Sequence, residues 1–247
     1  MTKLQNGYVI YRGPSLIDGA PIVMIATGFR NKTDNEKTGA MIQTWILRED
    51  INPNDAVHSG KDYTICGNCK HRGFLVGGKN KGRTCYVNVW QAPNVVWKAY
   101  KRGIYEQVSY NFITNLFYGK LVRGGSYGDP AAVPSLIWSK IFKKAKGWTG
   151  YTHAWHNSNL RIWFMASVDN ERERVAAKAL GYRTFRIRTD ETDRVMNREI
   201  VCPASKEAGF KTTCSACKAC AGISAKAKCD IAIIDHGQRL FTSSSAK

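Results

Sequence analysis

Acidic residues are scarce in this chain of 247 residues, which has 19 Asp and Glu against 37 Lys and Arg and a formal net charge of +18. This imbalance indicates a polyanionic partner, and nucleic acid is the first candidate. The alternative is a basic surface without a specific partner, because charge alone reports only solubility and non-specific attraction. Long apolar runs are missing as well. No stretch approaches the about 20 residues of a membrane-spanning helix, so no membrane association is expected.

Several catalytic motifs are also absent. The chain has no GxxxxGKS or GxxxxGKT phosphate loop, no G-x-S-x-G elbow and no HExxH motif. These absences argue against P-loop nucleotide hydrolases, serine hydrolases and zinc peptidases. No repeat of fixed period is visible, which argues against a solenoid. The segment Met1 to Ile10 lacks the apolar run of a secretory signal, so we expect an intracellular, cytoplasmic protein.

Cysteine, in contrast, is concentrated in two groups that hold seven of the eight cysteines. The first group consists of Cys66, Cys69 and Cys85, and the second of Cys202, Cys214, Cys217 and Cys220. Disulfides between such close neighbours would be strained, whereas a cysteine at every third residue brings several thiolates to one centre. The spacing therefore predicts a metal or iron–sulfur protein in a reducing compartment.

The first group offers three thiolates, and His71 is a candidate for a fourth ligand. Four such ligands would satisfy tetrahedral zinc. The three cysteines alone could instead hold a 4Fe–4S cluster with one iron left open for a substrate or cofactor. The spacing does not decide between the metals, because both accept thiolates. A surface or supporting role for His71 is the alternative to ligation.

The second group has four obvious ligands and so forms a closed set, with Cys229 as a spare or replacement. Closed four-cysteine sites are structural or transfer electrons, since no position is left for a substrate. The run CSACKAC is similar to the cysteine run of bacterial-type ferredoxins, although the proline that follows there is missing here. Iron–sulfur binding is the favoured hypothesis for the two groups, as one or two 4Fe–4S clusters, and zinc is the alternative.

Strand-like and helix-like segments alternate along the chain, which predicts an α/β fold with a partial or full (βα) barrel-like core. The expected strands are 21–27, 41–47, 121–128, 151–155, 161–167, 182–188, 199–202 and 230–235. The expected helices are 94–102, 134–146 and 170–181. We expect residues 1–200 to form the core with the first cysteine site, 201–240 a cysteine-rich metal-binding segment with metal-binding loops, and 241–247 a disordered tail.

Two turns after expected strands add to the cysteine pattern. The segment LVRGGSYGDP ends in Gly128-Asp129-Pro130, and a later strand ends in Ser167-Val168-Asp169. With the first cysteine group, this order resembles the radical S-adenosylmethionine superfamily, whose first barrel strand is followed by a three-cysteine loop. The chain departs from that superfamily in its wider spacing, because fifteen residues separate Cys69 from Cys85.

The resemblance implies an enzyme in which the first cysteine group holds a 4Fe–4S cluster that binds S-adenosylmethionine. It further implies that Gly128 and Asp129 contact the methionine end, and that Ser167 and Asp169 contact the ribose. The second group then resembles an auxiliary cluster domain. The alternatives are a β-turn at Gly128-Asp129 and a helix cap at Asp169.

The CxxC, CYVN, YGDP and CPAS motifs also resemble a family of phage proteins, which would place the protein in the cytoplasm of the host cell. The most concrete hypothesis is an iron–sulfur enzyme that acts on nucleic acid, with aromatic residues stacking on bases. Those aromatic residues are Trp97, Tyr100, Trp138 and Trp148, for which a core position is the alternative. The competing hypothesis is a zinc-stabilised basic protein that binds nucleic acid or a host protein without catalysis. His153 and His156 are candidates for proton transfer or for a structural role.

Overall fold

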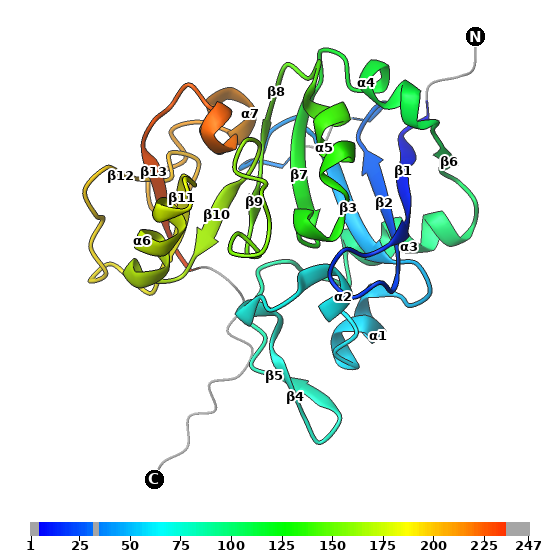
Figure 1. Ribbon diagram of the computed structural model, residues 1–247, viewed down its shortest axis with the longest axis horizontal. Coiled ribbons are helices and arrows are strands. Elements are labelled where there is room, and N and C mark those ends of the chain that lie inside the picture. Colours follow the sequence, from blue (N-terminus) through cyan, green and yellow to red (C-terminus); the bar gives the residue numbers. More distant parts are fainter. Residues whose placement is uncertain (1–4, 32–34, 236–247) are drawn as a thin grey trace.

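The computed structural model describes residues 5–31 and 35–235, and Figure 1 shows two sheets that lie side by side with helices around them. The larger sheet has the strand order β6-β1-β2-β3-β7-β8. The pairs β1–β2 and β2–β3 are antiparallel, and the other three pairs are parallel. Its strands are β6 (Glu106–Gln107), β1 (Gly7–Pro14), β2 (Pro21–Thr27), β3 (Ile42–Arg48), β7 (Leu121–Tyr127) and β8 (Gly147–Thr149).

The second sheet is entirely parallel, with the order β12-β13-β11-β10-β9. Its strands are β12 (Glu199–Val201), β13 (Asp230–Ile234), β11 (Thr184–Arg188), β10 (Met165–Val168) and β9 (Tyr151–Thr152). Only Gly150 separates β8 from β9, so one short stretch pairs with β7 in its first half and with β10 in its second. A Cβ atom at Gly150 would lie 2.7 Å from the Phe164 ring, so the junction of the two sheets requires glycine.

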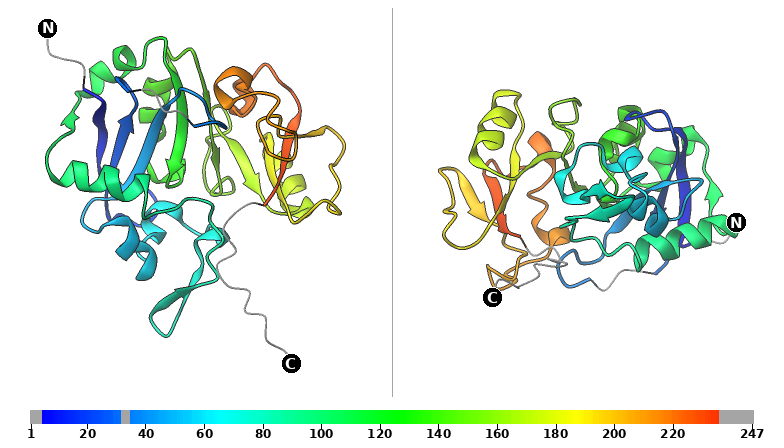
Figure 2. Two further views of the ribbon diagram at one scale, coloured as in Figure 1. Left: turned by 180° about the vertical axis from the view of Figure 1, so that it is seen from behind. Right: turned by 90° about the horizontal axis from the view of Figure 1, so that it is seen from below.

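Helices and a small hairpin complete the described structure, as the two further views in Figure 2 show. The α-helices are α1 (Pro53–His58), α2 (Tyr63–Cys66), α3 (Ala92–Lys101), α4 (Ile113–Leu116), α5 (Ser135–Phe142), α6 (Glu171–Ala179) and α7 (Cys214–Cys217). Four 3-10 turns are η1 (Lys70–Arg72), η2 (Tyr110–Phe112), η3 (Pro130–Ala132) and η4 (Gly222–Ser224). The hairpin consists of β4 (Phe74–Val76) and β5 (Lys79–Lys81).

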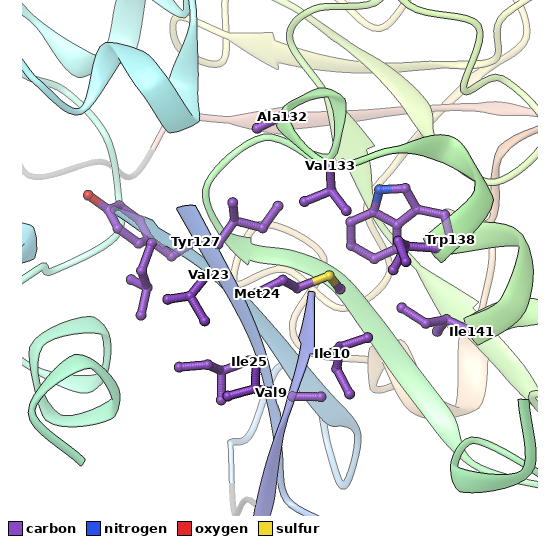
Figure 3. Close-up of a cluster of buried hydrophobic side chains, with 14 of the residues drawn as sticks. Val9, Ile10, Val23, Met24, Ile25, Tyr127, Ala132, Val133, Trp138 and Ile141 are labelled. Atoms are coloured by element: carbon purple, nitrogen blue, oxygen red, sulfur yellow. The ribbon is translucent and has the colours of Figure 1, made fainter. Parts of the chain in front are cut away.

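The main core lies between the larger sheet and α5. Strand β2 is the most apolar, and its run from Ile22 to Ala26 is completely buried because the strand is central in its sheet. Figure 3 shows Trp138 and Ile141 of α5 beside Met24 of β2. Trp138 is fully buried, so the prediction that it stacks on nucleic-acid bases is wrong. The other three aromatic residues that were candidates for stacking pack against the same core; these are Trp97, Tyr100 and Trp148.

The predicted mixture of helices and strands is confirmed, but several predicted boundaries are wrong: β9 ends at Thr152 and not at residue 155, β11 begins at Thr184 and not at residue 182, and the two largest differences are in α5 and β10. Helix α5 ends at Phe142 and not at Lys146, because the backbone beyond it pairs with the loop before β7. There Lys144 accepts a hydrogen bond from Gly119, and Lys146 donates one to Lys120. Strand β10 begins at Met165 and not at residue 161, because Trp163 and Phe164 donate to the Leu160 carbonyl in a turn.

The C-terminal part of the chain enters the second sheet. Strand β13 lies between β11 and β12, so the segment 201–240 supplies a central strand as well as the second cysteine group. The expected disordered tail 241–247 lies outside the described residues. Among the helices that the structure describes, none is long and apolar enough to cross a membrane.

Candidate metal centre

The first cysteine group comes together at the end of β7. Cys66 is the last residue of α2, Cys69 precedes η1, and Cys85 follows the β4–β5 hairpin. All three line one cavity of ≈ 70 Å³, which Gly128 and Asp129 also line. The structure therefore brings together the three predicted ligands and the first predicted cofactor turn, although fifteen residues separate Cys69 from Cys85.

Burial and mutual proximity govern the acidity of these thiols. Burial raises the pKa of Cys66 well above its usual value, and the charges of Asp62, Cys69 and Cys85 raise it further. Burial and Cys85 raise the pKa of Cys69 to about 12. Burial also raises the pKa of Cys85, against the opposing effect of the Arg83 cation. Three thiolates here are therefore unfavourable without a cation to neutralise them, and in its absence burial keeps the thiols protonated.

The Gly128-Asp129 turn is shaped by the protein itself. Gly128 has φ +81°, and a Cβ there would lie 2.7 Å from the Ile46 carbonyl oxygen. Asp129 Oδ1 accepts hydrogen bonds from Ala131 N at 2.9 Å and Thr152 Oγ1 at 2.6 Å. Its Oδ2 accepts from His153 N at 2.7 Å. The buried carboxylate thus joins the ends of β7 and β9, as a turn-forming residue does.

Asp169 anchors the first cysteine loop to the end of β10. Its Oδ1 lies 2.8 Å from His71 Nε2, and its Oδ2 lies 3.0 Å from Lys70 Nζ. Burial opposes ionisation, but the hydrogen bonds and charges of His71 and Lys70 bring the pKa of Asp169 below its usual value. The other ring nitrogen of His71 bonds Thr84 Oγ1 at 2.8 Å. His71 therefore has both nitrogens in use and supports the loop.

Asn170, and not Asp169, caps the helix that follows. Its Oδ1 accepts a hydrogen bond from Glu173 N at 2.9 Å. The Glu173 carboxylate in turn accepts from the backbone N–H of Asp169 at 2.8 Å. These two hydrogen bonds resemble a capping box shifted by one residue, and they fix the backbone at the carboxyl end of β10.

A larger cavity of ≈ 240 Å³ adjoins the first cysteine group, and Cys69 and Cys85 line both cavities. Ser167, the remaining predicted cofactor residue, lines the larger one. His153 lines both cavities, and its ring centroid lies 5.7 Å from that of His71. Burial lowers the pKa of His153, against the raising effect of Asp129 and Asp169. His156 lies in neither cavity.

The second cysteine group lies beside β10, β11 and β13. Its cysteines pack with Met165, Phe185 and Ile233 in one apolar cluster, of which Cys229 is also a member. Burial raises the pKa of Cys220 well above its usual value, and the neighbouring Cys202, Cys214 and Cys217 raise it further. The four predicted ligands therefore lie close enough to influence one another.

Local backbone geometry produces the tight cysteine run. Thr213 caps α7 by accepting from Ala216 N, and Lys218 then adopts a left-handed conformation with φ 54°. This reversal directs the chain from Cys217 toward Cys220. The two groups lie toward opposite ends of the strands, since α2 lies beyond the end of β7 and α7 packs against β8, which pairs with the start of β7 (Figure 1).

Sequence reasoning missed three polar residues between the two cysteine groups. Arg123 Nη2 donates to the hydroxyl of Tyr86 at 2.8 Å, and Tyr86 lies 3.0 Å from the hydroxyl of Tyr151. The available signals were weak: Tyr86 directly follows Cys85, and Arg123 is a cation between apolar and glycine residues of a strand.

A basic face lies near the start of β7. Lys140 Nζ lies 4.5 Å from the Tyr110 ring centroid, and Lys144 Nζ lies 5.9 Å from that of Tyr118. The sequence contains a signal for this face, because the only acidic residue between Glu106 and Asp169 is the buried Asp129. We call it the lysine–aromatic face; its members are Tyr110, Phe112, Tyr118, Lys120, Lys140, Lys143, Lys144 and Lys146.

Across the described residues, no group of three or more His, Cys, Asp or Glu side chains is found that could hold a metal ion. Comparisons with known proteins add no assignment, since no family model, curated protein or solved structure matches the chain.

Proposed function

We propose that the chain is an iron–sulfur enzyme of the radical S-adenosylmethionine type that acts on nucleic acid. The observation that carries the proposal is the shared cavity of the three cysteines of the first group, Gly128 and Asp129. Residues distant in the sequence meet there in the combination that the resemblance implies.

The strand order supports a barrel-like arrangement as part of this proposal. Strands β3, β7, β8–β9, β10, β11 and β13 lie side by side in the order in which they occur in the sequence, each parallel to the next. Strands β4, β5 and β6 intervene in the sequence between β3 and β7, and β12 between β11 and β13. The carboxyl ends of parallel strands meet at one edge. The first cysteine group, the Gly128-Asp129 turn and the end of β10 all lie at that edge.

The donor set of the first group fits a 4Fe–4S cluster. Three thiols surround the cavity, and His71 is held by Thr84 and Asp169, so the protein offers three ligands and not four. Such a cluster would be held by Cys66, Cys69 and Cys85 and, once reduced by an external reductant, would supply the electron for reductive cleavage of S-adenosylmethionine. The protein's own contribution is positional: Lys70 and His71 bind Asp169 and so hold the loop against β10.

The second group fits a closed four-thiolate site. Its cysteines pack against the five-stranded sheet, and all are buried or partly buried. A metal centre there would stabilise this segment in addition to its apolar packing, and a cluster would also transfer electrons.

The lysine–aromatic face is the proposed nucleic-acid contact. Lysines neutralise phosphates, and exposed aromatic rings stack on unpaired bases. Tyr118 is 68% exposed and Phe112 51% exposed, so both rings are available for stacking. Single-stranded nucleic acid is therefore the expected partner.

A second candidate function is nucleic-acid or host-protein binding without catalysis, with zinc in the cysteine sites. One observation favours it: the lysine–aromatic face lies at the start of β7, whereas the first cysteine group lies at its end. A strand of seven residues spans about 20 Å. Binding at this face therefore does not need the cysteine cavity.

Metal and sulfide analysis of protein purified without oxygen tests the proposal. We expect iron and acid-labile sulfide, a broad absorption band near ~400 nm, and cleavage of S-adenosylmethionine once a reductant is added. Zinc in a colourless protein would overturn the iron–sulfur assignment and favour the second candidate. Iron and sulfide without any cleavage would retain the clusters and overturn the proposed reaction.

A further inference from the structure

The larger cavity beside the first cysteine group has two chemically different walls. One wall is apolar and consists of Phe185, Ile187 and Ile233 from β11 and β13. The other wall is polar and includes Arg123 and Ser167. A cavity with an apolar side and a few convergent polar groups is the usual form of a small-molecule site.

Arg123 contributes a guanidinium to the polar wall, which Lys37, His71 and Asp235 also line. Its side chain donates one described hydrogen bond, to the hydroxyl of Tyr86, and among the described residues no Asp or Glu forms an ion pair with it. The thiol of Cys214 in the second group lies near enough to influence the pKa of Arg123. Arg123 is partly buried, and guanidinium donors there are costly to leave without an anion. The planar guanidinium matches a carboxylate or a phosphate in geometry.

Two further polar atoms in the cavity lining are unpaired. Ser167 Oγ and His153 Nε2 are buried, and neither has a hydrogen-bond partner among the residues that the structure describes. Buried polar atoms in folded proteins are nearly always hydrogen-bonded, so each unpaired atom needs an explanation. A ligand in the cavity that both residues line would supply the missing partner, as a water molecule would.

The volume limits the size of that ligand. A cavity of ≈ 240 Å³ lies just below the about 300 Å³ at which the usual range of small-molecule pockets begins. A small organic molecule is therefore the ligand that suits it.

We propose that this cavity binds a small organic anion, with its carboxylate or phosphate on Arg123 and its apolar or aromatic body against Phe185, Ile187 and Ile233. Ser167 and His153 then supply hydrogen bonds to its polar groups. The inference goes beyond the proposed function. Cys69 and Cys85 also line the cavity, but the side chains proposed to hold the anion are not thiols, so the binding test does not require a particular metal in the first group.

Calorimetric titration of the full-length chain, purified with its metal content unchanged, tests the proposal. The probes are phenyl phosphate, phenylacetate and the neutral benzyl alcohol at one ionic strength. The wild-type chain should bind at least one anionic probe more tightly than the alcohol. In Arg123→Gln that affinity should fall about 10- to 100-fold, the range expected for hydrogen bonds to a charged group, while the alcohol changes little.

Arg102→Gln is the matched control, because it removes one exposed positive charge of the same type from the end of α3. It should bind all three probes as the wild type does. Phenyl phosphate and phenylacetate distinguish the two anionic groups, and a preference for either supports the proposal. Equal binding by Arg123→Gln and wild type, or no preference of the wild type for either anion over the alcohol, overturns it.

Ile187→Trp tests the cavity if Arg123→Gln does not fold. This variant keeps Arg123 but fills the space beside it, so the binding of both anionic probes should be lost. Anionic binding that persists in Ile187→Trp would place the anion elsewhere and overturn the proposal.

Discussion

His71 Nε2 lies 2.8 Å from Oδ1 of Asp169, although the two residues are 98 positions apart in the sequence. Both side chains are largely buried, with 15% and 9% exposure. The contact connects the loop of the first cysteine group to the carboxyl end of β10. It explains how a glycine- and lysine-rich loop can hold a defined position over the sheet without a core of its own.

Substitution of Asp169 should therefore loosen that loop. In Asp169→Ala, both His71 and Lys70 lose their acceptor, and we expect the unfolding free energy to fall by about 1–3 kcal/mol. Denaturant unfolding measures this loss, and metal analysis should show a lower metal content. Glu191→Ala, at an exposed position, is the control and should change neither. A variant as stable and as metal-rich as the wild type would show that the contact does not support the loop.

The two cysteine groups should lose metal independently. In Cys69→Ser we expect the iron and sulfide of the first group to be lost while those of the second remain, because the groups lie toward opposite ends of the strands. Cys229→Ser should keep both, since the second group already has four ligands without it. Metal analysis of the two variants beside the wild type measures this. Full iron and sulfide content in Cys69→Ser would contradict the assignment of the first group.

The position of Gly128 should be sensitive to a single methyl group. In Gly128→Ala the new Cβ would lie 2.7 Å from both the Cβ and the carbonyl oxygen of Ile46, and φ would stay at +81°. Gly119→Ala is the matched control, because its φ is +67° and nothing lies within 4 Å. Both variants should lose about 1–2 kcal/mol of unfolding free energy through the left-handed backbone. Gly128→Ala should lose more unfolding free energy than Gly119→Ala, because its new methyl group also meets Ile46. Equal losses in the two variants would show that Ile46 moves away from the methyl group.

Apolar segments made most of the fold predictable from the sequence. The prediction of β2 matches the structure residue for residue, and α3 and β13 differ from their predictions by at most two residues at either end. Strand β1 was missed because its polar and glycine residues give it no long apolar run. The early end of α5 depends on hydrogen bonds to Gly119 and Lys120, which sequence periodicity does not contain.

The candidate site was partly predictable. Cysteine spacing identified both groups, and turn residues identified Gly128, Asp129 and Asp169. Spacing could not show that Asp169 is paired with His71 and Lys70, because that contact depends on how the loop folds over the sheet. For the same reason, Arg123 and the unpaired atoms of Ser167 and His153 became visible only once the strands were placed side by side.

The lysine–aromatic face should account for the affinity for single-stranded nucleic acid. The triple variant Lys140→Gln, Lys143→Gln and Lys144→Gln removes three charges beside exposed rings. The logarithm of the binding constant falls as log salt rises. Each phosphate that is no longer neutralised should make this negative slope shallower by about 0.7. Fluorescence anisotropy with a labelled oligonucleotide at several salt concentrations measures this slope. If each of the three lysines binds one phosphate, the slope should become shallower by about 2.

The triple variant Lys98→Gln, Lys101→Gln and Arg102→Gln is the control, because it removes the same charge from α3, away from that face. If affinity followed net charge alone, both triple variants would lose it equally, and the binding would be non-specific attraction to a chain of charge +18. A reduced slope in the first variant together with a wild-type slope in the second would place the phosphate contacts on α5 and the residues that follow it. Tyr118→Ala should then weaken binding further at every salt concentration, because stacking on a base contributes about 1–3 kcal/mol and is not screened by salt.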